Sequence, residues 1–212
     1  MNSLSRRLSA QHFLHTAAQG SAKGPVWLAD VPHCVRLGFK GPRAEQWLAE
    51  QNLPIPAAAN SWCALQNRWD IVARTGASEF FIETDPDAPI ATRLDAAAPV
   101  TGVYRVLRED SAFVLSGPAA EQALLQVCAI DFISLDLAAA PLIMTLMADV
   151  AVLVVPQMTG ATRRYRVWCD PSFGAYLWTT LAQIVQDCAG SIIGPAQIPA
   201  GPLVLPDPTR GG

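Results

Sequence analysis

The chain has 212 residues, of which 51% are hydrophobic and 16% are charged, and its net charge is −3. This length favours one large domain with or without arms, and the charge offers no basic patch for nucleic-acid binding. A membrane-spanning helix needs about 20 apolar residues, and the most apolar run, 142–155, is shorter and contains Asp149.

The low charge content predicts a large protein–protein interface. An average soluble domain has roughly 25% charged residues, whereas this chain has 16% and a mean hydropathy of +0.24. A surface with so few charges is typical of a protein that another polypeptide covers. An alanine-rich composition from a GC-rich genome would also raise the apolar fraction, and this alternative stays open.

The cysteines and histidines indicate no metal site. The five cysteines are odd in number, none is spaced as C-x-x-C, and most lie in apolar runs, which predicts free thiols in a reducing cytoplasm. The three histidines all lie in the first 33 residues, without cysteine or carboxylate neighbours at ligand spacing. These residues are Cys34, Cys63, Cys128, Cys169, Cys188, His12, His15 and His33.

The first part of the chain predicts an arm, a strand and a helix. Residues 1–24 are polar and poorly periodic, and we expect them to form a flexible arm. A transit peptide is the alternative, because such peptides are poor in acidic residues and the first acidic residue of this chain is Asp30. Val26–Phe39 predicts strand structure. Gly41-Pro42 then predicts a helix start, because proline is favoured at the first helical position. The expected helix face contains Ala44, Trp47, Leu48 and Gln51, and Pro54 and Pro56 end the helix.

Three strands and a short helix are expected next. The strands are Ser61–Gln66, Asp70–Arg74 and Glu79–Glu83, and a turn at residues 75–78 joins the last two. Asp85 or Asp87 is the expected cap of a short helix that begins at Pro86 and has Ile90 and Leu94 on its apolar face.

The later part repeats this order. We expect strands at Arg105–Leu115, Leu142–Met147, Val150–Val155 and Tyr165–Cys169, and a helix after Gly117-Pro118. A longer helix begins at Asp170-Pro171 and ends at Gly190. Its expected apolar face contains Tyr176, Leu177, Thr180, Leu181, Ile184, Val185 and Cys188.

A ten-residue segment occurs twice. Residues 39–48 read FKGPRAEQWL, residues 115–124 read LSGPAAEQAL, and Thr75-Gly76-Ala77-Ser78 has a counterpart in Thr159-Gly160-Ala161-Thr162. Ordered repetition predicts a duplicated unit. We therefore expect an α+β domain at 25–192 that consists of two strand-helix-strand-strand-helix halves, about 25–98 and 103–192. A Pro/Gly-rich tail, 193–212, follows and is expected to be extended or to lie on a partner.

No residue pattern predicts catalysis. Gly-Pro at a helix start suggests an anion site, but a strand-to-helix turn accounts for it better. The Thr75-Gly76 and Thr159-Gly160 pairs predict hairpin turns with glycine at positive φ, and Glu79 is either a ligand-binding carboxylate or a solvated strand residue. The possible carboxylate pairs, Asp131 with Asp136 and Glu109 with Asp110, are interpreted as loop and strand-end residues.

The six tryptophans exceed what a small core needs, so some are candidate interface anchors, although Trp47 and Trp178 are interpreted as core. The remaining four are Trp27, Trp62, Trp69 and Trp168. From the residues we therefore assign no catalytic residue and no metal ligand, and we leave cofactor-binding residues unknown.

The order of these motifs resembles the γ subunit of heterotetrameric sarcosine oxidase, a family similar in fold to the folate-binding domain of the aminomethyltransferase of glycine cleavage. In the aminomethyltransferase, a threonine–glycine turn, an acidic residue and an aromatic strand lie by the folate, and residues 73–80 look like a short version without the glycine-rich turn. The folate-site aspartate has no assignable position. The segments are RLGFKGPRAEQWLAEQNLPIP (Arg36–Pro56), ARTGASEFFIE (Ala73–Glu83), FVLSGPAAEQALLQVCAIDF (Phe113–Phe132) and YRVWCDPSFGAYLWTTL (Tyr165–Leu181).

The resemblance implies a non-catalytic, cytoplasmic subunit of a flavin-dependent oxidoreductase. The complex would convert sarcosine to glycine, with H2O2 and formaldehyde or methylene-tetrahydrofolate as the other products. FAD, FMN, NAD, tetrahydrofolate and zinc would belong to the α, β and δ partners, of which α is the main contact. Two alternatives stay open: a freestanding folate-dependent C1-transfer protein, and a γ-type scaffold of another N-methyl amino-acid dehydrogenase complex.

Overall fold

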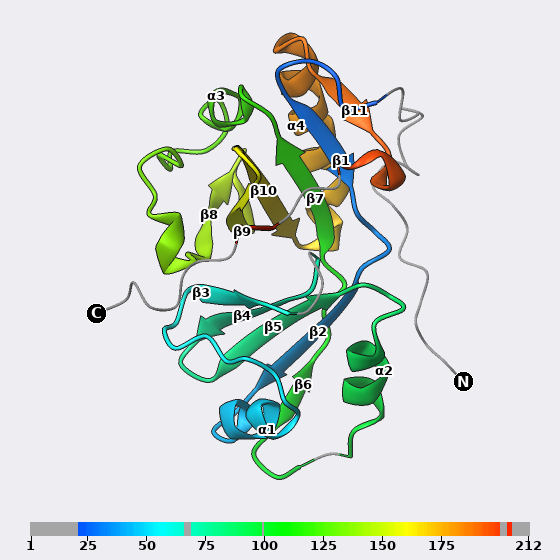
Figure 1. Ribbon diagram of the computed structural model, residues 1–212, viewed down its shortest axis with the longest axis vertical. Coiled ribbons are helices and arrows are strands. Elements are labelled where there is room, and N and C mark those ends of the chain that lie inside the picture. The colour runs from blue at the N-terminus through cyan, green and yellow to red at the C-terminus, as the bar shows by residue number, and fades with distance from the viewer. Residues whose placement is uncertain (1–20, 66–68, 99, 200–202, 205–212) are drawn as a thin grey trace. The chain divides into compact units, whose positions relative to one another are not determined.

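The computed structural model describes residues 21–65, 69–98, 100–199 and 203–204. Within these ranges the chain forms helices and two β-sheets, which confirms the predicted α+β class (Figure 1). The chain divides into two compact units. Unit 1 contains the described residues of Met1–His33, Glu109–Leu135 and Met144–Val204, and unit 2 contains those of Cys34–Arg108 and Asp136–Ile143.

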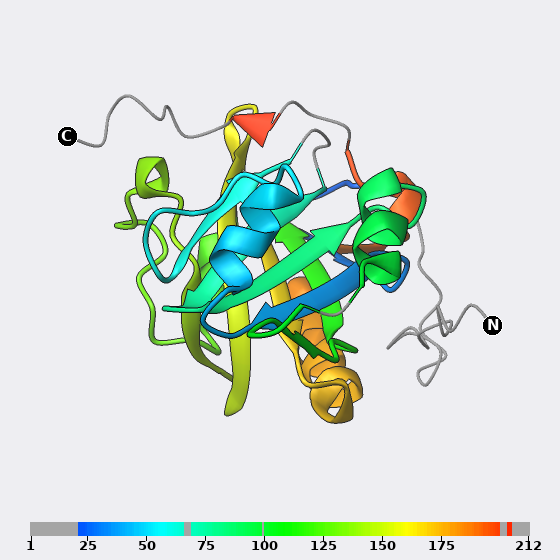
Figure 2. The ribbon, with the colours of Figure 1, turned by 90° about the horizontal axis from the view of Figure 1, so that it is seen from below.

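Unit 2 contains an antiparallel sheet, sheet B, in the order β3-β4-β5-β2-β6. Two helices lie on one face of this sheet, as Figure 2 shows. Consecutive strands pair in the part β3-β4-β5 of this order, whereas β2 pairs with β5 and β6, which follow later in the chain. The elements are β2 (Val35–Lys40), α1 (Ala44–Glu50), β3 (Ser61–Ala64), β4 (Ile71–Gly76), β5 (Glu79–Thr84), α2 (Pro89–Ala96) and β6 (Tyr104–Val106).

The core of unit 2 lies between sheet B and its two helices. Strand residues alternate between the faces of a sheet, so Phe39, Phe80 and Ile82 point toward the helices. Trp47 of α1 contacts the Phe39 ring at a centroid distance of 5.0 Å, and Leu94 of α2 completes the cluster. Burial of these aromatic and aliphatic side chains is the main stabilising contribution to this unit.

Unit 1 contains sheet A, in the order β11-β1-β7-β10-β9-β12, with β8 paired to β9. The pairing of β1 with β11 is parallel, and the other registers determined for this sheet are antiparallel. The strands are β1 (Trp27–Asp30), β7 (Ser111–Ser116), β8 (Ile143–Met147), β9 (Val150–Thr159), β10 (Thr162–Cys169), β11 (Ser191–Ile193) and β12 (Leu203–Val204). The helices of this unit are α3 (Ala120–Leu124), α4 (Gly174–Asp187) and the 3₁₀ turns at Pro171–Phe173 and Pro195–Gln197, whereas the 3₁₀ turn at Leu137–Ala139 belongs to unit 2.

The long helix α4 packs on sheet A through its apolar face. The Trp178 ring is fully buried and lies 5.6 Å from the ring of Phe113 on β7. The helix ends near Gly190 as predicted, but Ala189 takes the left-handed conformation, and the Gly190 amide donates to the Val185 carbonyl in a Schellman arrangement. The expected apolar face is wrong at Tyr176, which is exposed, because the face is rotated toward Trp178.

The repeated segment has the same local geometry in both units. Gly41 and Gly117 have φ of +122° and +131°, and each lies against a backbone carbonyl that a Cβ atom would approach within 2.4 Å, that of Gly102 or Pro25. The amide two residues later donates to that same carbonyl, at 3.1 Å for Arg43 and 2.8 Å for Ala119. The Gly-Pro pair is therefore a strand-to-helix turn, as predicted.

The two sheets also share a strand order. Strands β6-β2-β5-β4-β3 of sheet B correspond in order to β1-β7-β10-β9-β8 of sheet A. The edge strand β6, which pairs with β2, comes from the second predicted half. Strand β1, which pairs with β7, comes from the first predicted half. The predicted halves, 25–98 and 103–192, are therefore not the compact units. The shared order supports a duplication, which itself stays a prediction.

Other predicted boundaries differ from the structure. Val26–Phe39 and Arg105–Leu115 each divide into two strands that belong to different sheets, β1 with β2 and β6 with β7. Helix α2 begins at Pro89 rather than Pro86, because the Asp85 carboxylate accepts the Asp87 amide and closes a turn first. The predicted arm and tail lie largely outside the described residues, and their described parts include the 3₁₀ turn at Pro195–Gln197 and strand β12.

Candidate functional site

The threonine–glycine turn of unit 2 is held by Arg74. Its guanidinium donates to the carbonyls of Pro56 at 3.2 Å and Ala77 at 2.7 Å, and to the Glu45 carboxylate at 2.9 Å. Glu45 belongs to the repeated segment, so the repeated glutamate ties α1 to the β4–β5 hairpin. The hydrogen-bond donors of Arg74 are therefore occupied by groups of the same chain. Donors of this kind could otherwise bind an anionic ligand.

Glu79 is the candidate ligand-binding carboxylate, and the structure places it half-buried at the start of β5. It pairs across the strands with Lys40, and its carbonyl accepts the Thr75 hydroxyl at 3.3 Å. The prediction of positive φ is wrong for Gly76, where a bulge between β4 and β5 forms the bend instead. It is confirmed for Gly160, which has a φ of +60°.

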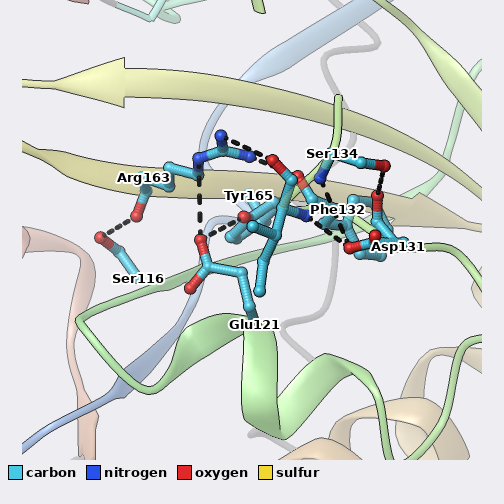
Figure 3. A network of polar contacts seen from close by, with 8 residues as sticks. Ser116, Glu121, Asp131, Phe132, Ser134, Arg163 and Tyr165 are labelled. Atoms are coloured by element: carbon cyan, nitrogen blue, oxygen red, sulfur yellow. Dashed lines mark hydrogen bonds and ion pairs between the residues drawn. The ribbon is translucent and has the colours of Figure 1, made fainter. Parts of the chain in front are cut away.

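A second polar network surrounds the other repeated glutamate, Glu121, in unit 1 (Figure 3). The buried Tyr165 hydroxyl donates to the Glu121 carboxylate at 2.6 Å, and Arg163 Nε lies 3.9 Å from the same oxygen. The Arg163 guanidinium also donates to the carbonyls of Phe132 and Ile133, the latter at 3.1 Å. The Phe132 ring packs edge-on against Tyr165 at a centroid distance of 5.2 Å. The network therefore attaches the segment after α3 to sheet A.

The electrostatics of this network do not fit an acid–base catalyst. Burial, followed by the hydrogen bond and charge of Glu121, raises the pKa of Tyr165 well above its usual range, although Arg163 opposes the shift. A general acid or base works best with a pKa near the operating pH. The Tyr165 phenol instead stays neutral and acts as a hydrogen-bond donor.

Loss of the Tyr165 hydroxyl is expected to destabilise unit 1. Because the hydroxyl donates to a charged group, Tyr165→Phe should lower the free energy of unfolding by about 1.5–3 kcal/mol at pH 7. An unfolded phenol ionises near pH 10, and the folded one has a raised pKa. The Tyr165 contribution is thus fully present below pH 10 and decreases as the pH rises above it.

Urea denaturation between pH 7 and 11 measures both effects. Tyr176→Phe is the matched control, because the Tyr176 side chain is 54% exposed. That control should keep wild-type stability at every pH, whereas Tyr165→Phe should lack the alkaline decrease due to this phenol. Identical curves for the two variants would contradict the role of Tyr165.

The predicted carboxylate pairs do not form an acid–base site. The Asp131 carboxylate accepts the Ile133 amide at 3.0 Å, and the Asp136 carboxylate accepts the Ala138 amide at 2.9 Å, so each closes a local turn. The two aspartates belong to different units. Glu109 and Asp110 precede β7, which agrees with the interpretation as loop and strand-end residues.

A buried ion pair in unit 2 was not predicted. Arg36 Nε lies 2.6 Å from the Glu83 carboxylate, and both side chains are at most 1% exposed. The predicted strands Val26–Phe39 and Glu79–Glu83 contain these two residues, but the pairing of the two strands was not predicted. The signal available in the sequence was the opposite charge of Arg36 and Glu83, which the strand register brings together.

The five cysteines are free, and those at positions 34, 128 and 169 are buried. Burial, with smaller effects from the charges of Asp110, Asp170 and Asp30, raises the pKa of Cys169 to about 12. Burial also raises the pKa of Cys63. A nucleophilic cysteine needs a lowered pKa, so neither thiol fits that role.

The described residues contain neither a metal-binding cluster nor a membrane-spanning helix. No group of three or more His, Cys, Asp or Glu side chains there could hold a metal ion. No helix within the same residues is long and apolar enough to cross a membrane.

The exposed apolar residues differ from those expected. All six tryptophans are at most 9% exposed, so the interpretation of some as surface anchors is wrong for the chain by itself. Their large rings fill the cores of both units instead. The large apolar side chains on the surface of the described part are Tyr104, Leu107, Leu125, Ile133, Met144, Leu146, Phe173 and Tyr176.

Comparison with known proteins identifies the fold. No protein-family model matches the chain, and no curated protein matches it. A chain of heterotetrameric sarcosine oxidase from Corynebacterium sp. U-96, solved with pyrrole 2-carboxylate, has a TM-score of 0.69 and 21% identity. That match covers 86% of this chain and 96% of the other.

A second solved structure has the same fold. Glycine cleavage system aminomethyltransferase T from Bartonella henselae has a TM-score of 0.61 and 14% identity over 82% of this chain. The present chain spans 48% of that protein's length. The fold predicted from the resemblance, that of the aminomethyltransferase and the sarcosine oxidase chain, is thus confirmed.

Proposed function

We propose that the chain is a γ-type structural subunit of a heterotetrameric sarcosine oxidase. The complex would demethylate sarcosine oxidatively to glycine, with H2O2 and formaldehyde or methylene-tetrahydrofolate as products. The observation that carries the proposal is the near-complete match to a chain of that oxidase, 96% of its length, compared with 48% of the aminomethyltransferase. The match thus covers nearly all of one oxidase chain and about half of the transferase, which supports the subunit role.

The polar groups of the chain support a structural role. Arg74 and Arg163, each near a repeated glutamate, donate to carbonyls and carboxylates of their own unit. Tyr165 and Cys169 have raised pKa values, which suits a neutral, buried role better than proton transfer. These four side chains hold segments of the chain in place. The proposal assigns the oxidation of sarcosine to the partner subunits.

The proposal places the cofactors elsewhere in the complex. FAD, FMN, NAD, tetrahydrofolate and zinc are assigned to the α, β and δ subunits, with α as the main contact of this chain. The low charge content and the exposed apolar side chains support a covered surface. Five free cysteines support a reducing, cytoplasmic setting.

Co-expression tests the proposal. Expression of this chain with the α-, β- and δ-type chains of its own organism should yield a four-chain complex that oxidises sarcosine and releases H2O2. The chain expressed alone should be colourless and aggregate. Omission of this chain from the co-expression is the control, and it should lower the yield of soluble α-type chain.

Other outcomes identify the alternatives. A soluble chain that binds tetrahydrofolate by itself, measured by calorimetry, would contradict the subunit role and support a freestanding C1-transfer protein. A four-chain complex that oxidises another N-methyl amino acid, and not sarcosine, would indicate a related dehydrogenase.

A further inference from the structure

Strand β8 is an open edge of sheet A. It pairs with β9, and the described residues provide no strand on its other side. An edge strand presents unpaired N–H and C=O groups that can pair with another chain, and proteins usually protect such edges with charges, proline or very short strands. Strand β8 has the sequence IMTLM, with no charged residue and no proline.

The two edge strands of sheet B, β6 and β3, are protected. Strand β6 carries Arg105, whose guanidinium pairs with Asp95 at 2.9 Å. Strand β3 is covered by the segment 140–142, since the Trp62 amide donates to the Ala140 carbonyl at 3.1 Å and the Leu142 amide donates to the Asn60 carbonyl at 2.8 Å. Strand β8 is five residues long and shares neither device.

One face of β8 is apolar and exposed. Met144 and Leu146 are 51% and 58% exposed, and alternation places both on the same face. The opposite face is occupied, because Thr145 Oγ1 lies 3.9 Å from Cys128 Sγ and the Ala148 amide donates to the Val127 carbonyl. A partner at this edge would therefore contact Met144 and Leu146 while its backbone pairs with β8.

The charges around the edge identify the kind of partner. No lysine, arginine or histidine occurs between Arg108 and Arg163, and the charged residues nearest β8 in sequence are Asp136 and Asp149. Asp149 forms the turn between β8 and β9. A second copy that pairs through its own β8 would bring the same segment 109–162, which has acidic residues and no lysine or arginine, whereas a segment flanked by lysine or arginine would complement the edge.

We infer that β8 accepts an extended, apolar segment of a different polypeptide, flanked by lysine or arginine, as an added strand of sheet A. This mode combines main-chain hydrogen bonds with side-chain contacts on alternate residues. The inference rests on the proposed function, and it assigns the β8 edge to the contact with the large α-type subunit.

Charge at the edge tests the inference. Leu146→Lys, co-expressed with the α-, β- and δ-type chains, should weaken binding of this chain to the complex about 100-fold or more, because lysine is depleted at the buried centre of interfaces. Tyr104→Lys is the matched control, because Tyr104 is equally exposed at 58% and lies on β6, an edge strand of the other sheet that is protected by Arg105. This control should bind as the wild type does, and both variants should fold because the replaced side chains are exposed.

Hydrogen exchange of the assembled complex separates strand pairing from a side-chain contact. Amides of 143–147 should exchange at least about 10-fold more slowly in the complex than those of 104–106, which form an edge strand of the other sheet in the same sample. Equal binding of Leu146→Lys and wild type, or unprotected β8 amides, would overturn the β8 inference and leave the subunit proposal intact. Failure of the wild-type chain to join the oxidase chains would overturn both, and a stable homodimer would replace the partner with a second copy.

Discussion

Replacement of Glu83 by alanine is expected to lower the free energy of unfolding of unit 2 by about 3–5 kcal/mol, since it leaves a buried guanidinium without the carboxylate beside it. The pair has an Nε–oxygen distance of 2.6 Å, and both side chains are at most 1% exposed. Urea denaturation of the dilute chain, followed by tryptophan fluorescence, measures the loss, because all six tryptophans are buried and report on unfolding.

Two variants control this measurement. Asp95→Ala removes the carboxylate of an exposed pair with Arg105 and should cost about 1 kcal/mol or less, because solvent screens surface pairs. The double variant Arg36→Met/Glu83→Leu should recover most of the stability, because it removes both buried charges together. If Glu83→Ala costs no more than Asp95→Ala, the buried pair does not stabilise the fold as described.

The second large effect is expected at Gly117. Its φ of +131° is unfavourable for any residue with a Cβ, and an added Cβ would lie 2.4 Å from the Pro25 carbonyl oxygen. Gly117→Ala combines backbone strain of about 1–2 kcal/mol with a steric conflict of about 1–3 kcal/mol, and should cost about 2–5 kcal/mol. The same urea denaturation measures it.

Gly160→Ala separates the two contributions. Gly160 also has positive φ, +60°, but nothing lies within 4 Å of an added Cβ. This variant should therefore cost only the strain contribution, about 1–2 kcal/mol. Equal losses at the two positions would show that the close contact with Pro25 does not matter and would contradict the account of the repeated turn.

Local signals predicted most individual elements. The Gly-Pro turns were predicted because both glycines and both prolines are visible in the repeat, and β4, β5 and α4 follow from alternation and helical periodicity. The sheet to which each strand belongs was not predictable, since alternation identifies a strand without its partner. This is why Val26–Phe39 was read as one stretch although β1 and β2 belong to different sheets.

The polar networks were less predictable than the fold. The repeat marked Glu45 and Glu121, but their partners depend on tertiary contacts that place Arg74 beside one and Tyr165 beside the other. The burial of Arg36 was not predictable, because a charged residue between apolar ones normally faces water, whereas here Arg36 is buried beside Glu83. The tryptophans were misread because residue type alone does not distinguish a core ring from a surface ring.

The sheets to which β1 and β6 belong affect how the chain folds during synthesis. Strand β1 lies in the first predicted half but belongs to sheet A, and β6 lies in the second predicted half but belongs to sheet B. Unit 2 gains its last strand when residues 104–106 leave the ribosome, whereas Trp27–Asp30 is made earlier and pairs only with β7 and β11. This strand thus remains without either partner until β7 (Ser111–Ser116) has been translated, and without β11 until Ser191–Ile193 has been translated. Division of the gene near codon 100 would separate each sheet from a strand that it requires, so the two fragments would have to reassociate before either sheet is complete.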